Sequence, residues 1–148
     1  MTISTHRAGP ADLDALVPLF DAYRQFYRQP ADPERAREWL RSRLRFGESV
    51  VFVAMRGGAM VGFTQLYPMY SSVRTARTWI LNDLYVAVAA RRNGAGQALL
   101  EAAAQFARDD GALGISLETT LDNAAARGLY RAAGWSEDAT QWYSLAFD

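Results

Sequence analysis

The 148-residue sequence contains no cysteine and no lysine. The lack of cysteine excludes disulfides, thiolate metal sites and a cysteine acyl-enzyme. All sixteen cationic side chains are arginine, which excludes a lysine base, a Schiff-base lysine and the lysine of a Walker phosphate loop. With His6 as the single histidine, neither a histidine-based triad nor a histidine metal cluster can be assembled. The sequence therefore predicts no metal site.

The sequence also has no excess of charge and no long hydrophobic run. Sixteen acidic side chains balance the sixteen arginines, so nothing indicates a general nucleic-acid binder. No apolar run approaches the roughly 20 residues of a membrane span, and the N-terminus has no signal-peptide pattern. We expect a cytoplasmic protein with neither nucleic acid nor membrane as a partner. Half of the residues are apolar, which suits one domain over residues 1–148.

Hydrophobic periodicity and turn residues predict the element order β-α-α-β-β-β-α-β-α-β-β. Strands are expected over residues 3–8, 49–55, 59–67, 79–88 and 112–120, followed by two short segments after Trp135, the last over 141–147. Pro68 is expected to end the third strand, leaving a loop or a frayed strand end over 69–77. Helices are expected from Pro10 to about Tyr27 and over 33–45, 94–110 and 123–133. This order predicts an α/β (α+β) fold: a mixed central sheet of about seven strands, helices on both faces, and a parallel pair across the 94–110 helix.

A glycine-containing turn between strand 79–88 and the following helix is the strongest local signal. Unpaired amides at a helix start, beside glycines that permit close approach, suit a phosphate group. A Walker loop would need a lysine, and the dinucleotide fingerprint would need glycine where Leu99 stands, so both fail. The turn Arg91-Arg92-Asn93-Gly94-Ala95-Gly96 instead matches R/Q-x-x-G-x-G/A, a coenzyme A signature. A second match, N-x-x-A-x-x-L-Y-x-x-x-G-[FWY], covers residues 123–135.

On these two motifs and the element order, essentially the whole chain resembles the GNAT family of N-acetyltransferases, which use acetyl-CoA as co-substrate. Segments 20–27, 82–86 and 94–96 are also similar to the small yeast acetyltransferases that act on histones, polyamines or D-amino acids. The resemblance implies direct acetyl transfer to a primary amine. Because the chain has no cysteine, we expect sequential rather than ping-pong kinetics.

The resemblance also assigns residues to the coenzyme. The pyrophosphate would lie on the backbone amides of the turn, with two arginines adding charge. The edge of the preceding strand would pair with the pantetheine arm, and the Val86 N–H would stabilise the thioester oxyanion. Tyr130 would protonate the departing thiolate. The cofactor-binding set is Leu84, Val86, Val88, Arg91, Arg92, Asn93, Gly94, Ala95, Gly96, Gln97, Asn123 and Tyr130.

The general base is where the sequence departs from the family. Asn82 occupies the position at which many relatives carry glutamate, and an amide can only orient a water molecule. Asp83 is adjacent to Asn82, so its side chain would point to the opposite face of the strand unless a bulge turns it. Glu118 lies on the neighbouring expected strand. We therefore expect deprotonation of the amine through water, with Asp83 or Glu118 as the final acceptor.

The acceptor site is expected between the first two helices, the 67–72 segment and the strand end near 118–120. Aromatic side chains there, Tyr23, Tyr27, Tyr67 and Tyr70, suit a small amine such as an amino acid or a polyamine. Two alternatives stay open: acetylation of a protein lysine or N-terminus, and a catalytically silent acyl-CoA-binding domain. A homodimer is expected to pair through strand 141–147.

Overall fold

The computed structural model describes residues 2–148 and divides the chain into two compact units, residues 1–118 and 119–148. The first unit contains a five-stranded sheet in the order β1-β2-β3-β4-β5. Its strands are β1 (Ile3–Arg7), β2 (Val50–Arg56), β3 (Ala59–Ser71), β4 (Ala76–Val86) and β5 (Ile115–Ser116). Neighbours are antiparallel up to β4, and β4 and β5 are parallel. The mixed sheet and its parallel pair were both expected from the sequence.

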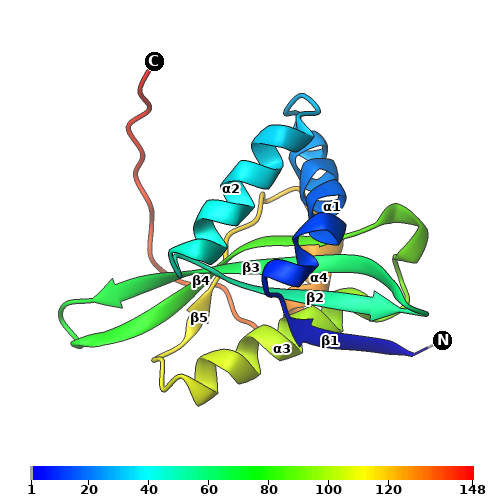
Figure 1. Cartoon of the computed structure of the whole chain (residues 1–148). Helices are drawn as coiled ribbons and strands as arrows, with labels where there is room; N and C mark the ends of the chain where they lie inside the picture. The colour runs from blue at the N-terminus through cyan, green and yellow to red at the C-terminus, as the bar shows by residue number, and fades with distance from the viewer. Residues whose placement is uncertain (1) are drawn as a thin grey trace. The chain divides into compact units, whose positions relative to one another are not determined.

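Helices cover both faces of this sheet (Figure 1). On one face lie α1 (Leu13–Phe26), which a short 3₁₀ turn η1 (Pro10–Asp12) precedes, and α2 (Pro33–Arg45). The other face carries α3 (Ala95–Asp109), which follows β4 and the 3₁₀ turn η2 (Val88–Ala90). The alternation of side chains along β2 explains the two layers, because Val51 and Val53 pack with the α1 core while Ala54 packs with Leu99 of α3.

Strand β3 runs further than the sequence predicts. Pro68 was expected to end it at about Tyr67, but β3 continues to Ser71 and pairs with β4 throughout. The reason lies in its other neighbour, since β2 pairs with β3 only as far as Leu66. Beyond that point β3 is an edge segment on its β2 side, where proline is tolerated.

The expected seven strands are five in the structure. Strand 112–120 shortens to Ile115–Ser116, because β5 pairs with β4 over those two residues alone. The two strands expected after Trp135 are absent from the described chain, where residues 135–148 have no regular secondary structure. A strand needs a partner for its backbone groups, and none of the described strands pairs with this segment. The homodimer expected through residues 141–147 stays a prediction.

The second unit, residues 119–148, contains helix α4 (Ala124–Ala132). The Asn123 side chain caps its start by accepting a hydrogen bond from the Ala126 amide at 3.2 Å. Gly134, at φ 91°, follows its end, as the sequence predicts. No helix within residues 2–148 is long and apolar enough to cross a membrane.

Candidate active site

A β-bulge at Asn82 sets the geometry of β4. Gln65 of β3 pairs with Asp83, whereas the next β3 residue pairs two positions further back along β4, so Asn82 has no partner. Before the bulge, an odd-numbered residue of β4 faces α3, since Trp79 packs on the ring of Phe106. After the bulge, the even-numbered residues Leu84 and Val86 face α3 instead. One extra residue therefore turns the Asp83 side chain to the sheet face that carries α1.

The Asp83 carboxyl is buried, with 3% of the residue exposed, and receives three side-chain hydrogen bonds. Asn82 Nδ2 donates to Oδ1 at 2.7 Å and the Tyr23 hydroxyl donates to the same oxygen at 3.2 Å. Gln65 Nε2 donates to Oδ2 at 2.5 Å. Burial raises the pKa of Asp83, and the three donors act against that rise. A carboxyl with these surroundings can exchange a proton at a higher pH than an ordinary aspartate.

Aromatic side chains surround this carboxyl on the α1 and α2 side of the sheet. Tyr23 contacts the ring of Tyr27 edge-on, with centroids 5.2 Å apart. Tyr67 accepts a hydrogen bond from Trp39 Nε1 at 3.3 Å, which ties α2 to β3. Burial raises the pKa of both Tyr23 and Tyr67, and the Asp83 charge acts in the same direction. The structure thus brings three of the four expected acceptor tyrosines to the side of the sheet that Asp83 faces.

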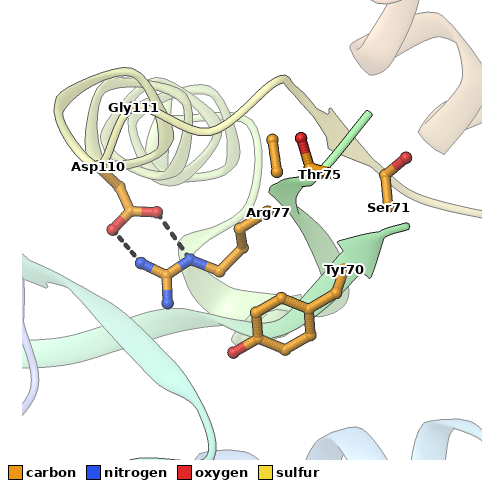
Figure 2. Close-up of a pocket in the computed structure, with 7 residues that line it drawn as sticks. Tyr70, Ser71, Thr75, Arg77, Asp110 and Gly111 are labelled. Atoms are coloured by element: carbon orange, nitrogen blue, oxygen red, sulfur yellow. Dashed lines mark hydrogen bonds and ion pairs between the residues drawn. The ribbon is translucent and has the colours of Figure 1, made fainter. Parts of the chain in front are cut away.

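Tyr70, the fourth of these tyrosines, lies elsewhere. It pairs with Arg77 near the β3–β4 hairpin, about 20 Å along β4 from Asp83. There it lines a pocket with Arg77 and Asp110, whose guanidinium and carboxyl face each other in Figure 2. Arg77 donates to the carboxyl through Nη2 at 2.5 Å and through Nε at 3.0 Å. The structure does not bring Tyr70 together with the other tyrosines.

The turn before α3 has the shape of a phosphate cradle. Arg92 and Gly94 both adopt positive φ, at 66° and 87°, and Gly94 caps the helix. A Cβ built on Gly94 meets nothing within 4 Å, so this position opens to solvent and the backbone can be approached closely. The Ala98 amide bonds the Gly94 carbonyl, leaving the amides of the first turn to face an incoming group.

The side chains of this turn serve different purposes. Arg91 donates from Nε to the Val86 carbonyl at 2.9 Å and lies over the rings of Phe26 and Tyr85, so it braces the end of β4. Gln97 donates to Glu101 within α3. Arg92 is exposed and is the arginine of the pair that can reach a phosphate. The amides and one guanidinium fit the pyrophosphate of coenzyme A.

The second half of β4 fits the arm of the coenzyme. Within the described residues, β5 pairs with β4 only at Trp79 and Ile80, although β4 continues to Val86. The backbone edge beyond Ile80 therefore lacks a strand neighbour on that side. Leu84 and Val86 pack into the core beneath α3, which leaves backbone amides and carbonyls for an extended, amide-containing ligand. Val88 follows in η2 and is exposed.

The remaining expected site residues belong to different parts of the chain. Glu118 is exposed, two residues beyond the end of β5. Asn123 and Tyr130 belong to the second unit, where Asn123 caps α4 and the Tyr130 ring lies 6.2 Å from that of Trp135. Asn93 donates long hydrogen bonds to the carbonyls of its own turn, and Ala95 is buried. Asn93 and Ala95 thus shape the turn by fixing its backbone.

Sequence reasoning missed two members of the Asp83 network. Gln65 is fully buried in β3, and Ser49, just before β2, donates to its side-chain oxygen at 2.8 Å. The signal was present in the sequence, because Gln65 is a lone amide in the middle of an apolar strand. A buried polar group of that kind needs a partner across the sheet.

Comparisons with known proteins indicate the family of the chain. The model of the acetyltransferase (GNAT) family matches residues 14–135. YhfO, an uncharacterized N-acetyltransferase of Bacillus subtilis (strain 168), is 45% identical over 136 residues, which are 92% of this chain and 91% of that protein. The crystal structure of a probable acetyltransferase, 40% identical, superposes with a TM-score of 0.93 over 100% of this chain and 99% of its own.

A more distant solved structure shares the fold. The aminoglycoside N-acetyltransferase AAC(6')-Iy, in complex with CoA, is 16% identical and superposes with a TM-score of 0.82 over 97% of this chain and 95% of its own. The family match covers most of the chain, and the Bacillus subtilis relative spans nearly the whole of it. The chain therefore belongs to the GNAT family of acetyltransferases and is an acetyl-CoA-dependent N-acetyltransferase.

Proposed function

We propose that this enzyme transfers the acetyl group directly to the primary amine of a small molecule, such as an amino acid or a polyamine. One observation carries the proposal: the second half of β4, which among residues 2–148 has a strand neighbour on its β3 side alone, leads into the open turn of α3 and also holds a buried carboxyl, Asp83, beside an aromatic wall. The wall consists of Tyr23, Tyr27 and Tyr67. Aromatic side chains close to a carboxyl suit a compact amine, because a cation is attracted to both.

The proposed chemistry assigns one task to each group. Asp83 accepts the proton of the ammonium through a water that Asn82 orients, since Asn82 is exposed and already bonds the carboxyl. The neutral nitrogen forms its bond to the acetyl carbon, and the Val86 amide receives the oxyanion. The carbon–sulfur bond then breaks, and Tyr130 gives its proton to the sulfur. The nitrogen loses its second proton through water, which restores the Tyr130 hydroxyl as the amide forms. Acetyl-CoA supplies the activated acyl group.

We also infer that both units form one acetyltransferase domain over residues 1–148. The family match supports this inference, because it runs from residue 14 to 135 and so crosses the boundary after Glu118. It also includes Asn123 and Tyr130, the residues that the family motif assigns to the pantetheine arm and to the leaving thiolate.

The test is thiol release from acetyl-CoA with a panel of acceptors: amino acids, amino-acid amides, polyamines, an aminoglycoside and lysine peptides. We expect turnover with one class of small amine and intersecting lines when both substrates are varied. Tyr130→Phe should lower kcat by about 10²-fold. Tyr143→Phe, which removes the hydroxyl of an exposed tyrosine in the same unit, is the matched control and should keep wild-type kcat.

Other outcomes would contradict the proposal in different ways. Release with peptides alone would show a protein acetyltransferase. Coenzyme binding without release for any acceptor would show a silent acyl-CoA-binding domain. Parallel lines in the two-substrate plot would indicate an acyl-enzyme and would overturn direct transfer.

A further inference from the structure

Ser49 and Gln65 form a buried polar pair that ends on the Asp83 carboxyl. Ser49 Oγ donates to Gln65 Oε1 at 2.8 Å, and Gln65 Nε2 donates to Asp83 Oδ2 at 2.5 Å. All three residues are buried. We propose that Gln65, oriented by Ser49, is a positioning residue that holds Asp83 ionised and leaves its other oxygen for proton transfer. This inference rests on the proposed role of Asp83 as base.

The two oxygens of Asp83 have different neighbours, and this asymmetry supports the inference. Oδ2 faces Gln65, which is the cross-strand partner of Asp83 and is fully buried. Oδ1 receives its hydrogen bonds from Asn82, which is exposed at the bulge, and from Tyr23. The open side of the carboxyl is therefore Oδ1. A donor fixed on Oδ2 keeps the carboxyl from rotating and directs Oδ1 toward the exposed amide.

Neutral donors are what stabilise this charge. The ionisable groups that face Asp83 are Tyr23 on α1 and Tyr67 on β3. Arg43 and Glu48, which lie near Tyr67, pair with each other at 3.1 Å. Among the ion pairs of residues 2–148, none involves Asp83, so no cation offsets its burial. A buried carboxylate without a cation depends on its hydrogen-bond donors, and losing one favours the protonated form.

Gln65 could also serve only to tie β2, β3 and β4 together, and this structural role makes a different prediction. A structural residue affects folding, whereas a residue that holds Asp83 ionised affects the pH at which the enzyme loses activity. Thr64 provides a matched control on the same strand. It is fully buried, and its hydroxyl donates to the main-chain carbonyl of Asp83 at 2.8 Å, so it contacts the same residue without touching the carboxyl.

The experiment is the pH profile of kcat/KM for Gln65→Met, Thr64→Val and the wild-type enzyme. Each is measured with two acceptor amines of different pKa. An acidic limb of the profile that is due to the amine moves when the amine is changed, whereas a limb that is due to an enzyme group stays at the same pH. Asp83 must be ionised to act as base, so a higher pKa of Asp83 moves the acidic limb of the profile to higher pH. We expect Gln65→Met to shift the enzyme limb to higher pH by about one unit. Thr64→Val should leave the enzyme limb at its wild-type pH, even if the substitution lowers Tm.

Ser49→Ala and Asp83→Asn complete the set. Ser49→Ala should give a smaller shift in the same direction, and it decides the matter if Gln65→Met does not fold. An unshifted limb in whichever of these two variants folds would overturn the positioning role, while loss of the limb in Asp83→Asn would still support Asp83 as base. Persistence of the limb in Asp83→Asn would instead overturn the base itself.

Discussion

Two aspartates lie at the two halves of β4 and are held by opposite means: Asp110 bonds side chains of the first half, and Asp83 belongs to the second half. Asp110, just beyond α3, pairs with Arg77 and accepts a hydrogen bond from Trp79 Nε1 at 2.9 Å. The Trp79 hydrogen bond and the Arg77 guanidinium lower the pKa of Asp110. Burial raises the pKa of Asp83, whose donors are all uncharged or weakly acidic. A carboxyl paired with a cation stays charged and serves as an anchor, whereas one held by neutral donors can exchange its proton.

The largest effect should come from neutralising each aspartate in turn. Asp83→Asn should lower kcat/KM by about 10³-fold, because it removes the proposed proton acceptor without changing the size of the side chain. Asp110→Asn should leave kcat/KM near the wild-type value and lower Tm, because it weakens the charged pair with Arg77. Steady-state kinetics and thermal unfolding of both variants check this. Equal losses of activity would remove the distinction between the two halves.

The two ends of α3 offer a second test, of intermediate size. Gly94 and Gly111 flank this helix at φ 87° and 76°, and a Cβ on either would meet nothing within 4 Å. Alanine at either position should cost about 1 kcal/mol of stability through backbone strain. Only Gly94→Ala should raise the KM for acetyl-CoA, by about tenfold, because the coenzyme is proposed to lie against that turn. A similar rise in Gly111→Ala would show that the effect comes from the helix as a whole.

The smallest effect concerns stability and pH, where the two aspartates should act with opposite signs. Asp110 has a lowered folded pKa, so its contribution is present above the unfolded value of about 4 and is lost as pH falls. Asp83 has a raised folded pKa, so the folded state binds its proton more tightly and loses stability as pH rises above about 4. Urea unfolding between pH 3 and 7 should show the advantage of wild type over Asp110→Asn growing with pH. Over the same range the free energy of unfolding of Asp83→Asn should rise relative to that of wild type. If both differences from wild type changed with pH in the same direction, the opposite pKa shifts assigned to Asp83 and Asp110 would be contradicted.

Much of this fold could be predicted from local sequence signals. Alternating apolar residues indicated the central strands, and helical spacing indicated α1 to α4. Single polar residues mark two helix starts, since the side chains of Asp32 and Asn123 each accept a hydrogen bond from the backbone amide of the residue three positions later. The glycine-containing turn was also readable, because positive φ at Gly94 depends on the residue itself. These features depend on neighbours along the chain.

Features that depend on partners across the sheet were harder to predict. The sequence could not show that β2 stops pairing at Leu66, which is why Pro68 does not end β3. It also could not show that β5 pairs over two residues, or that residues 135–148 form no strand. The bulge left a trace, because the apolar alternation of β4 breaks at the adjacent polar residues Asn82 and Asp83. Only the pairing with Gln65 shows which side the carboxyl takes.

The bulge also changes what has to be preserved at Asn82. Substituting this residue alters one side chain, whereas deleting it would close the bulge, because Leu81 and Asp83 already pair with adjacent residues of β3. Asp83 would then stay opposite Gln65, on the sheet face that carries α1. The face of the carboxyl is therefore set by its pairing with Gln65, and what the extra residue adds is the exposed amide that donates to it.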